Sequence, residues 1–317
     1  MSFSQKTKNE LSKLSLEDRC CNLAELSALV RMCGTIQING SERISLKFSS
    51  ENASIARRIF SILKASYDAE IEVMVRRNRQ LKKNNNYLIA ITDKNIAKQI
   101  LLDVGFIQED KMNIFNPDYK MDKKIIKKRC CRRSYIRGSF LGGGSISNPE
   151  KTYHMEMVTN NKEHAEDLSE IINSFGLNSK IVLRKDNYIV YLKEGEHIVD
   201  MLNIMGAHQA LLKLEDIRVL KDIRNNINRI VNCETANLGK TIGASLRQIN
   251  DIDCIEAKIG LGKLPQNLRE VAYLRLENPD SSLKELGEML PSPVGKSGVN
   301  HRFRKIGEIA KDLRGGN

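Results

Sequence analysis

The sequence contains an internal repeat with an offset of 110 residues, and this repeat constrains the fold more than any other feature. The pair Cys20-Cys21 precedes LAELSALVRMCGTI (23–36), and the pair Cys130-Cys131 precedes RSYIRGSFLGGGSI (133–146). Self-similarity at a fixed offset predicts two copies of one structural unit. The aligned pairs are Ala28 with Gly138, Cys33 with Gly143, Gly34 with Gly144, and Ile36 with Ile146.

Similar hydrophobic patterns follow both copies. Alternating apolar residues predict strands, and a period near 3.6 predicts helices. Each half is therefore expected to fold as helix, two strands, helix, two strands, helix, and the fold class is α+β. In the first half we expect strands over 43–50, 70–77 and 86–93 and helices over 53–66 and 95–105. In the second half we expect strands over 153–160, 179–185 and 188–194 and helices over 162–176 and 197–206.

Small residues mark the two helices that open the repeats. Ser27 and Ala28 lie in the first helix, and Gly138 and Gly142 in the second. Residues of this size allow two backbones to approach closely. We expect these helices to cross at a pseudo-two-fold axis. The strands of each half then form one curved sheet whose outer face can meet a partner.

The segments ELSALVRMCGTI (25–36) and YIRGSFLGGGSI (135–146) resemble the motif helices of LAGLIDADG homing endonucleases. That resemblance implies an acidic residue before the final glycine of each motif, and the pair of carboxylates holds a divalent metal for phosphodiester cleavage. Here Cys33 and Gly143 occupy these former catalytic positions. Glycine has no ligand atom in its side chain, and a thiol is a poor ligand for Mg²⁺. We therefore expect no catalytic residue and no enzyme activity.

Two other chemistries are conceivable for this region. A homing-type nuclease with displaced metal ligands stays open as an alternative, but Glu25 and Glu150 lie near neither aligned position. A phosphate cradle at glycines 142–144 is disfavoured, because a P-loop needs a Lys-Ser/Thr after its glycines and opens a helix. Here the glycines end a helix. We expect no cofactor.

Cysteine and histidine usage predicts no metal site. The chain has seven cysteines, an odd number, and no CxxC pair. The two Cys-Cys dipeptides lack zinc-site spacing, and the five histidines are scattered. No apolar run reaches membrane-spanning length, and the first residues have no apolar signal core. These features predict reduced thiols in a cytoplasmic, nucleoid-associated protein with no membrane partner.

The chain has an excess of positive charge. Its net charge is +12 and its pI is about 9.3, which favours an acidic polymer such as nucleic acid as partner. Residues 120–137 carry nine positive charges against one negative. A solvated linker is the open alternative to a phosphate-binding band. The expected phosphate contacts are Lys123, Lys124, Lys127, Lys128, Arg129, Arg132 and Arg133.

The sequence becomes helical throughout from about residue 207. An amphipathic run covers 209–232, and a further helix is expected from a cap at Thr235, followed by a glycine-containing linker. Residues 281–314 predict a helix-turn-helix. Ser282 and Glu285 form a capping box for its first helix, and Ser297 is expected to cap its second helix.

The second helix of this motif has an apolar stripe formed by Val299, Phe303, Ile306 and residues 309–310. Its opposite face carries side chains that can meet bases and phosphates in a major groove. An ordinary helical hairpin with a charged face is the open alternative. The expected DNA-binding residues are Lys284, Lys296, Ser297, Asn300, His301, Arg302, Arg304 and Lys305.

These features together resemble the WhiA family, over nearly the whole chain. The most specific segments are YIRGSFLGGGSIS, NCETAN (232–237) and ELGEMLPSPVGKSGVNHRFRKI. The resemblance implies a degenerate LAGLIDADG scaffold and a helix-turn-helix similar to region 4 of sigma factors. It also implies a transcription regulator linked to cell division and chromosome segregation, and to sporulation in some lineages.

The expected organisation has six parts. An N-terminal extension (1–19) precedes the first repeat (20–110), a basic connector (111–129) and the second repeat (130–206). A helical linker (207–263) and the DNA-binding domain (264–317) follow. Double-stranded DNA is the expected partner, with other transcription proteins as further partners and a monomer as the favoured state. A non-specific architectural nucleic-acid-binding protein stays open as a second alternative function.

Overall fold

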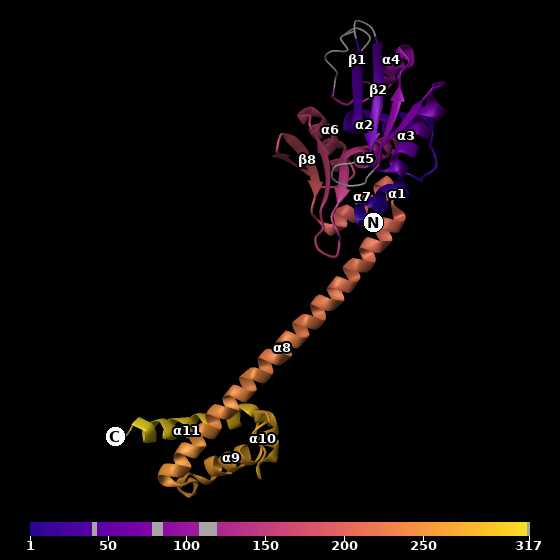
Figure 1. Ribbon diagram of the computed structural model, residues 1–317. Coiled ribbons are helices and arrows are strands. Elements are labelled where there is room, and N and C mark those ends of the chain that lie inside the picture. The colour runs from indigo at the N-terminus through magenta and orange to yellow at the C-terminus, as the bar shows by residue number, and fades with distance from the viewer. Residues whose placement is uncertain (40–42, 78–84, 108–118, 316–317) are drawn as a thin grey trace. The chain divides into compact units, whose positions relative to one another are not determined.

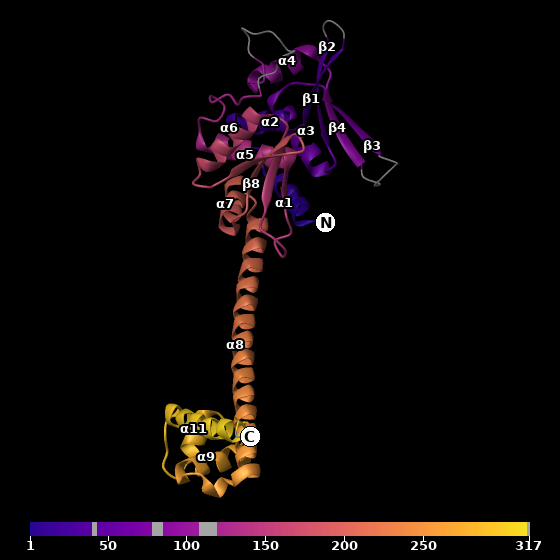
Figure 2. The ribbon, with the colours of Figure 1, turned by 90° about the vertical axis from the view of Figure 1, so that its left-hand side faces the viewer.

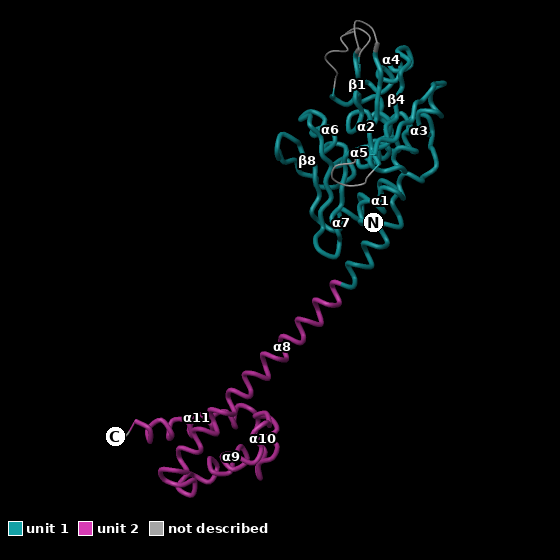
Figure 3. Tube along the Cα trace, in the orientation of Figure 1, with its two compact units in different colours: residues 1–220 teal, residues 221–317 magenta. Residues whose placement is uncertain are grey.

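The computed structural model describes residues 1–39, 43–77, 85–107 and 119–315. The chain divides into two compact units, residues 1–220 and 221–317, and each is described by itself (Figure 3). Residues 111–118 of the expected connector lie outside the described residues. No helix in the described part of the chain is long and apolar enough to cross a membrane.

The first unit begins with a short helix, which the sequence pattern did not indicate, followed by the two repeats. This helix, α1 (Phe3–Leu11), has a capping box formed by Ser2 and Gln5. The first repeat contains α2 (Arg19–Cys33), β1 (Gly34–Asn39), β2 (Arg43–Ser50), α3 (Ala53–Ser66), β3 (Glu72–Arg77), β4 (Asn85–Ile91) and α4 (Lys94–Asp103).

The second repeat has the same element order as the first. It contains α5 (Arg129–Gly143), β5 (Gly144–Ile146), β6 (Met155–Thr159), α6 (Lys162–Asn173), β7 (Lys180–Arg184), β8 (Asn187–Leu192) and α7 (Gly195–Met205). The predicted order of helices and strands is therefore confirmed in both halves, and so is the α+β fold class.

Each repeat forms its own antiparallel four-stranded sheet. The strand orders are β1-β2-β4-β3 and β5-β6-β8-β7, which are the same order shifted by one repeat. Opposing residues include Leu46 with Ile91 and Met155 with Leu192. Alternate residues of β2 and β6 are buried, so each sheet covers the helices with one face only.

The helices α2 and α5 pack against each other at the centre of the unit (Figure 1, Figure 2). A Cβ atom on Gly138 would lie 2.5 Å from the carbonyl oxygen of Glu25 and 3.0 Å from the Cβ of Ala28. A Cβ atom on Gly142 would lie 2.6 Å from the Cβ of Met32. The predicted close approach of the two helices is confirmed, and it requires glycine at these positions.

The second unit is helical and has its own core. The helix α8 (His208–Ile259) enters it, and η1 (Leu261–Lys263), α9 (Gln266–Glu277), α10 (Leu283–Met289) and α11 (Lys296–Gly315) follow. Its core is formed by residues from all of these elements, among them Ile252, Ile255, Leu261, Leu268, Val271, Leu286, Val299, Phe303 and Ile306.

The expectation of a new helix capped by Thr235 is wrong. α8 runs without interruption for 52 residues through this position. It contains no proline, and its glycines Gly239 and Gly243 cost about 1 kcal/mol each relative to alanine without ending a helix. α8 ends instead at Gly260, whose φ of 75° is the left-handed conformation typical of helix C-termini.

We predict that Gly138→Ala destabilises the first unit by about 1–3 kcal/mol, because the new methyl group collides with backbone that cannot move aside. Gly195→Ala is the matched control, since its Cβ would meet neighbours only at 3.6 Å. Urea unfolding of the full chain, followed by circular dichroism, measures both. Equal unfolding midpoints for the two variants would show that the α2–α5 contact is not as tight as described.

Candidate nucleic-acid interface

The helices α10 and α11 are joined by a tight turn. A Cβ atom on Gly287 would lie 2.1 Å from the carbonyl oxygen of Val294 and 3.1 Å from Cγ2 of Val299. The N–H of Val294 donates to the carbonyl oxygen of Gly287 at 3.1 Å. Glycine at position 287 therefore allows the turn to pack directly on α10, and this contact sets how the two helices meet.

The first helix of the motif begins as the sequence predicts. The Ser282 N–H donates to Oε2 of Glu285 at 2.6 Å, and the Glu285 N–H donates to Oγ of Ser282 at 3.3 Å. The predicted capping box is confirmed. The hydrogen bonds also lower the pKa of the Glu285 carboxyl group, which keeps it ionised beside the positive end of the helix dipole.

The expectation that Ser297 caps the second helix is wrong. α11 begins at Lys296, and the carbonyl oxygen of Gly295 accepts from the N–H of Val299 at 3.2 Å. Because Gly295 already accepts the first intrahelical bond, Ser297 lies inside the first turn. Its exposed hydroxyl group remains on the outer surface of the helix.

One face of α11 is buried and the opposite face is exposed. The buried residues are Val299, Phe303, Ile306 and Ala310, which belong to the predicted apolar stripe. Residues spaced by three or four share a helix face. The exposed face brings together predicted DNA-binding residues: Lys296, Ser297, Asn300, His301, Arg304 and Lys305.

Two predicted residues of the motif lie outside this exposed face. Arg302 is partly buried, and its Nη1 donates to the carbonyl oxygen of Asn267 at 3.3 Å, which ties α11 to the start of α9. Lys284 is exposed on α10, with its Nζ 3.9 Å from the Glu288 carboxylate. An exposed pair of this kind contributes little to stability, so the Lys284 ammonium group can exchange that partner for a phosphate.

A buried arginine that the sequence reading missed holds the motif against the rest of the unit. The Arg275 side chain is 2% exposed and lies over the Phe303 ring, with its Cζ 5.5 Å from the ring centroid. Its Nε donates to Oε1 of Gln248 at 3.0 Å. Its Nη1 donates to the carbonyl oxygens of Asn278, Pro279 and Ser281, at 3.3, 3.1 and 2.6 Å. Arg275 therefore fixes the chain between α9 and α10.

The basic segment of the first unit is only partly available to a ligand. Arg133 donates to the carbonyl oxygen of Ile204 at 2.8 Å, and Arg132 to the Ser174 hydroxyl at 3.1 Å. Arg129 is exposed, with its guanidinium 5.1 Å from the centroid of the Phe175 ring. Lys123, Lys124, Lys127 and Lys128 of the segment are exposed.

The former catalytic positions at the C-terminal ends of α2 and α5 do not form a metal site. The Cys33 thiol donates to the carbonyl oxygen of Leu29 at 3.3 Å. A Cβ atom on Gly143 would lie 2.3 Å from Cε of Met32 and 2.8 Å from the carbonyl oxygen of Val158. The Met32 side chain therefore occupies the space that a carboxylate at position 143 would need.

The N-terminal helix places a cation at the same end of the helix pair. Lys8 of α1 lies with its Nζ 5.7 Å from the centroid of the Phe140 ring. Burial lowers the pKa of the Lys8 ammonium group to about 8, which still leaves it mostly charged at neutral pH, and burial raises the pKa of Cys33 to about 12. A cationic amine beside a neutral thiol opposes the binding of Mg²⁺.

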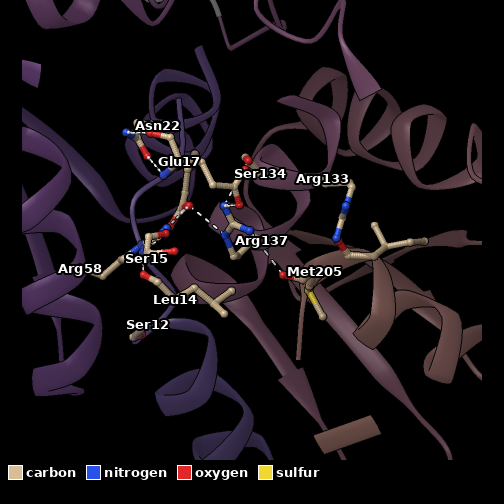
Figure 4. A network of polar contacts seen from close by, with 12 residues as sticks. Ser12, Leu14, Ser15, Glu17, Asn22, Arg58, Arg133, Ser134, Arg137 and Met205 are labelled. Atoms are coloured by element: carbon tan, nitrogen blue, oxygen red, sulfur yellow. Dashed lines mark hydrogen bonds and ion pairs between the residues drawn. The ribbon is translucent and has the colours of Figure 1, made fainter. Parts of the chain in front are cut away.

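The two alternative carboxylates, Glu25 and Glu150, have different surroundings, and that of Glu25 is already paired with two arginines. Glu25 is fully buried, and Nε of Arg58 and Nε of Arg137 donate to its two oxygens at 2.8 and 2.9 Å. Figure 4 shows the surroundings of Arg58 and Arg137. Glu150 is exposed, and its nearest side-chain partner is the Asn148 amide at 3.4 Å.

Family profiles match most of the chain. The profile described as the WhiA N-terminal LAGLIDADG-like domain matches residues 19–107, and the WhiA LAGLIDADG-like domain matches 132–224. The WhiA C-terminal HTH domain matches 227–310.

Relatives match over their full length. The probable cell division protein WhiA of Alkaliphilus metalliredigens (strain QYMF) is 56% identical over 315 residues, which cover 99% of each chain. The protein of the same description from Thermoanaerobacter pseudethanolicus is 58% identical over 314 residues, covering 99% of this chain and 98% of the relative. The crystal structure of full-length WhiA from Thermatoga maritima is 25% identical, with a TM-score of 0.60 and complete coverage of both chains.

The fold and the site define a class of protein in which two degenerate LAGLIDADG-like repeats precede a helix-turn-helix domain. Within that class, the profile matches and the full-length relatives decide the family. The chain belongs to the WhiA family.

We predict that Gly287→Ala unfolds or loosens the helix-turn-helix, because a methyl group 2.1 Å from a carbonyl oxygen forces α10 and the turn apart. Gly298→Ala is the control, since its Cβ would meet Val294 at 3.4 Å and alanine favours a helix by about 1 kcal/mol. Hydrogen exchange of the α11 amides reports on this unit alone. Unchanged protection in Gly287→Ala would contradict the described turn.

Proposed function

We propose that the chain is a DNA-binding transcription regulator of cell division that reads sequence through α11 and does not cut DNA. The observation that carries this proposal is the exposed face of α11, where Asn300, His301 and Arg304 lie together while the opposite face is packed into the core. A helix held in this way can enter a major groove with its first turns facing base edges.

The side chains on this face suit base recognition. An asparagine can pair with the N6 and N7 atoms of adenine, and an arginine with the O6 and N7 atoms of guanine. Lys296 and Lys305 flank these groups and suit phosphate contacts, which position a protein on DNA without reading its sequence. We propose that Lys284 of α10 makes a contact of the same kind.

The first unit adds affinity in this proposal, but no chemistry. Its exposed lysines over 123–128 suit backbone phosphates. Cys33, Gly143 and Met32 at the helix ends leave no paired carboxylates, so we propose that the unit is not a nuclease. The relatives' description as cell division proteins supports the cellular role. Chromosome segregation, and sporulation in some lineages, belong to the same proposal.

A non-specific architectural protein is the competing function, because the net charge of +12 alone gives affinity for any duplex. The two functions differ in how they discriminate between sequences. Capture of genomic DNA on the full chain, followed by sequencing, provides the test. Recovery of discrete sites supports the regulator, and uniform recovery of the genome supports the architectural protein.

We predict that Asn300→Ala and Arg304→Ala weaken binding to a captured site more than to random DNA, with a loss of discrimination of about 1–3 kcal/mol each. Lys284→Ala and Lys305→Ala should weaken binding to both DNAs alike. Lys311→Ala, exposed near the end of α11, is the control. Fluorescence anisotropy at several salt concentrations measures these affinities. Equal losses on both DNAs for Asn300→Ala and Arg304→Ala would assign base reading to another surface.

We predict that the purified chain does not nick or cleave a captured site in Mg²⁺ or Mn²⁺. The physical reason is the absence of paired carboxylates at positions 33 and 143, which Cys33 and Gly143 occupy. Supercoiled plasmid carrying the site is the substrate, and conversion to nicked or linear forms is the readout. Site-specific cutting that a chelator abolishes would refute the prediction.

A further inference from the structure

Four cysteines meet at the N-terminal ends of the two central helices. Cys20 and Cys21 lie in the first turn of α2, and Cys130 and Cys131 in the first turn of α5. Their four Sγ atoms all lie within 4.8 Å of one another. Their spacing in the sequence does not predict a metal site, because the fold joins two dipeptides that are 110 residues apart.

The four thiols lie close together across the helix interface, two from α2 and two from α5. Cys21 and Cys131 are buried, Cys20 is half-buried and Cys130 is exposed. The cluster therefore has an inner pair of sulfurs, and an outer side from which an ion can enter.

The size of the cluster fits a tetrahedral metal ion. A zinc–sulfur distance of about 2.3 Å places the sulfurs of such a site about 3.8 Å apart. The longest separation in the cluster is at most 4.8 Å, so closure needs a contraction of about 1 Å, which small side-chain rotations supply. Four sulfur ligands are a soft set that favours Zn²⁺ over Mg²⁺ or Ca²⁺.

Both dipeptides lie at helix N-termini, where the helix dipole and unpaired N–H groups stabilise thiolates. Arg19, Arg129 and Arg132 are adjacent in sequence to the two dipeptides. Metal binding displaces the thiol protons.

A buried polar network begins one helical turn after the cysteines of α5. The Ser134 hydroxyl accepts from Nη2 of Arg137 at 3.1 Å. Arg137 in turn pairs with Glu25 of α2. The N-terminal half of α5 therefore carries both the cysteines and the ion pair that joins it to α2.

We propose that Cys20, Cys21, Cys130 and Cys131 bind one Zn²⁺ ion as four thiolates in a closed structural site. Each repeat supplies two ligands, so the ion fastens the N-terminal ends of α2 and α5 together. It releases thiol protons to solvent on binding, and no electron transfer is involved. A site with four protein ligands has no open position for substrate, so its role is to stabilise the repeat interface.

The test uses the full chain, reduced and without chelator. After equilibration with Zn²⁺ and gel filtration, we expect about one zinc per chain by elemental mass spectrometry. Cys20→Ser/Cys131→Ser should lose this zinc, and Cys233→Ser, which alters an exposed cysteine of α8, should retain it. Zinc loading should also raise the unfolding temperature of the unmodified chain and leave that of the double variant unchanged.

A second test uses Co²⁺ in place of Zn²⁺ and needs no variant, so it also works if the double variant does not fold. Co²⁺ added to the unmodified chain should give sulfur-to-metal charge-transfer bands and the intense visible bands of a tetrahedral ion, and Zn²⁺ should remove them. A reduced chain that binds no zinc, with every thiol open to titration, would overturn the proposal. Cross-helix disulfides in a chain that binds no zinc after reduction would overturn it too.

Discussion

The first unit depends on the two buried ion pairs that the Glu25 carboxylate forms. Glu25 lies on α2 and pairs with Arg58 of α3 and Arg137 of α5, so one side chain ties the first repeat together and joins it to the second. Burying an ion is costly, and removing one partner of a buried pair usually costs about 3–5 kcal/mol. At the aligned position the second repeat has Tyr135, bonded to His164 at 2.9 Å. The two aligned positions therefore differ in their partners. Glu25 of the first repeat pairs with an arginine of the second, whereas Tyr135 bonds within its own repeat.

The residues that hold the two central helices together differ from the positions at which a LAGLIDADG nuclease binds metal. The contacts that hold α2 against α5 lie along the helices, at Gly138 and Glu25, whereas metal-binding carboxylates would lie at their C-terminal ends. Stability and catalysis therefore depend on different residues of one motif. At the catalytic end, Met32 fills the space beside Gly143 and α1 brings Lys8 close to Cys33. The Lys8 ammonium group and the Met32 side chain therefore lie where a metal-binding site would need a pair of carboxylates.

The sequence allowed most of the fold to be predicted, because alternation in β2 and β6 and small residues in α2 and α5 are local signals. Ser282 with Glu285 is such a signal too. Two expected helix starts were wrong, since Thr235 within α8 and Ser297 in the first turn of α11 are good caps that the backbone does not use as caps. Arg275 could not be singled out, because its partners are mostly backbone carbonyl oxygens, which every sequence supplies. The roles expected of the α11 side chains stay predictions.

The cysteine cluster shows what spacing within one segment cannot reveal. Ligand spacing identifies a metal site only when its ligands lie in one or two short loops. Cys20-Cys21 and Cys130-Cys131 were aligned by the repeat, and paired helices related by a pseudo-two-fold axis bring equivalent positions close together. The alignment of the two Cys-Cys dipeptides was therefore a signal that they could be neighbours in the fold, as they are. Here each copy supplies two of the four proposed ligands, and the packing of α2 against α5 brings the two halves of the cluster together.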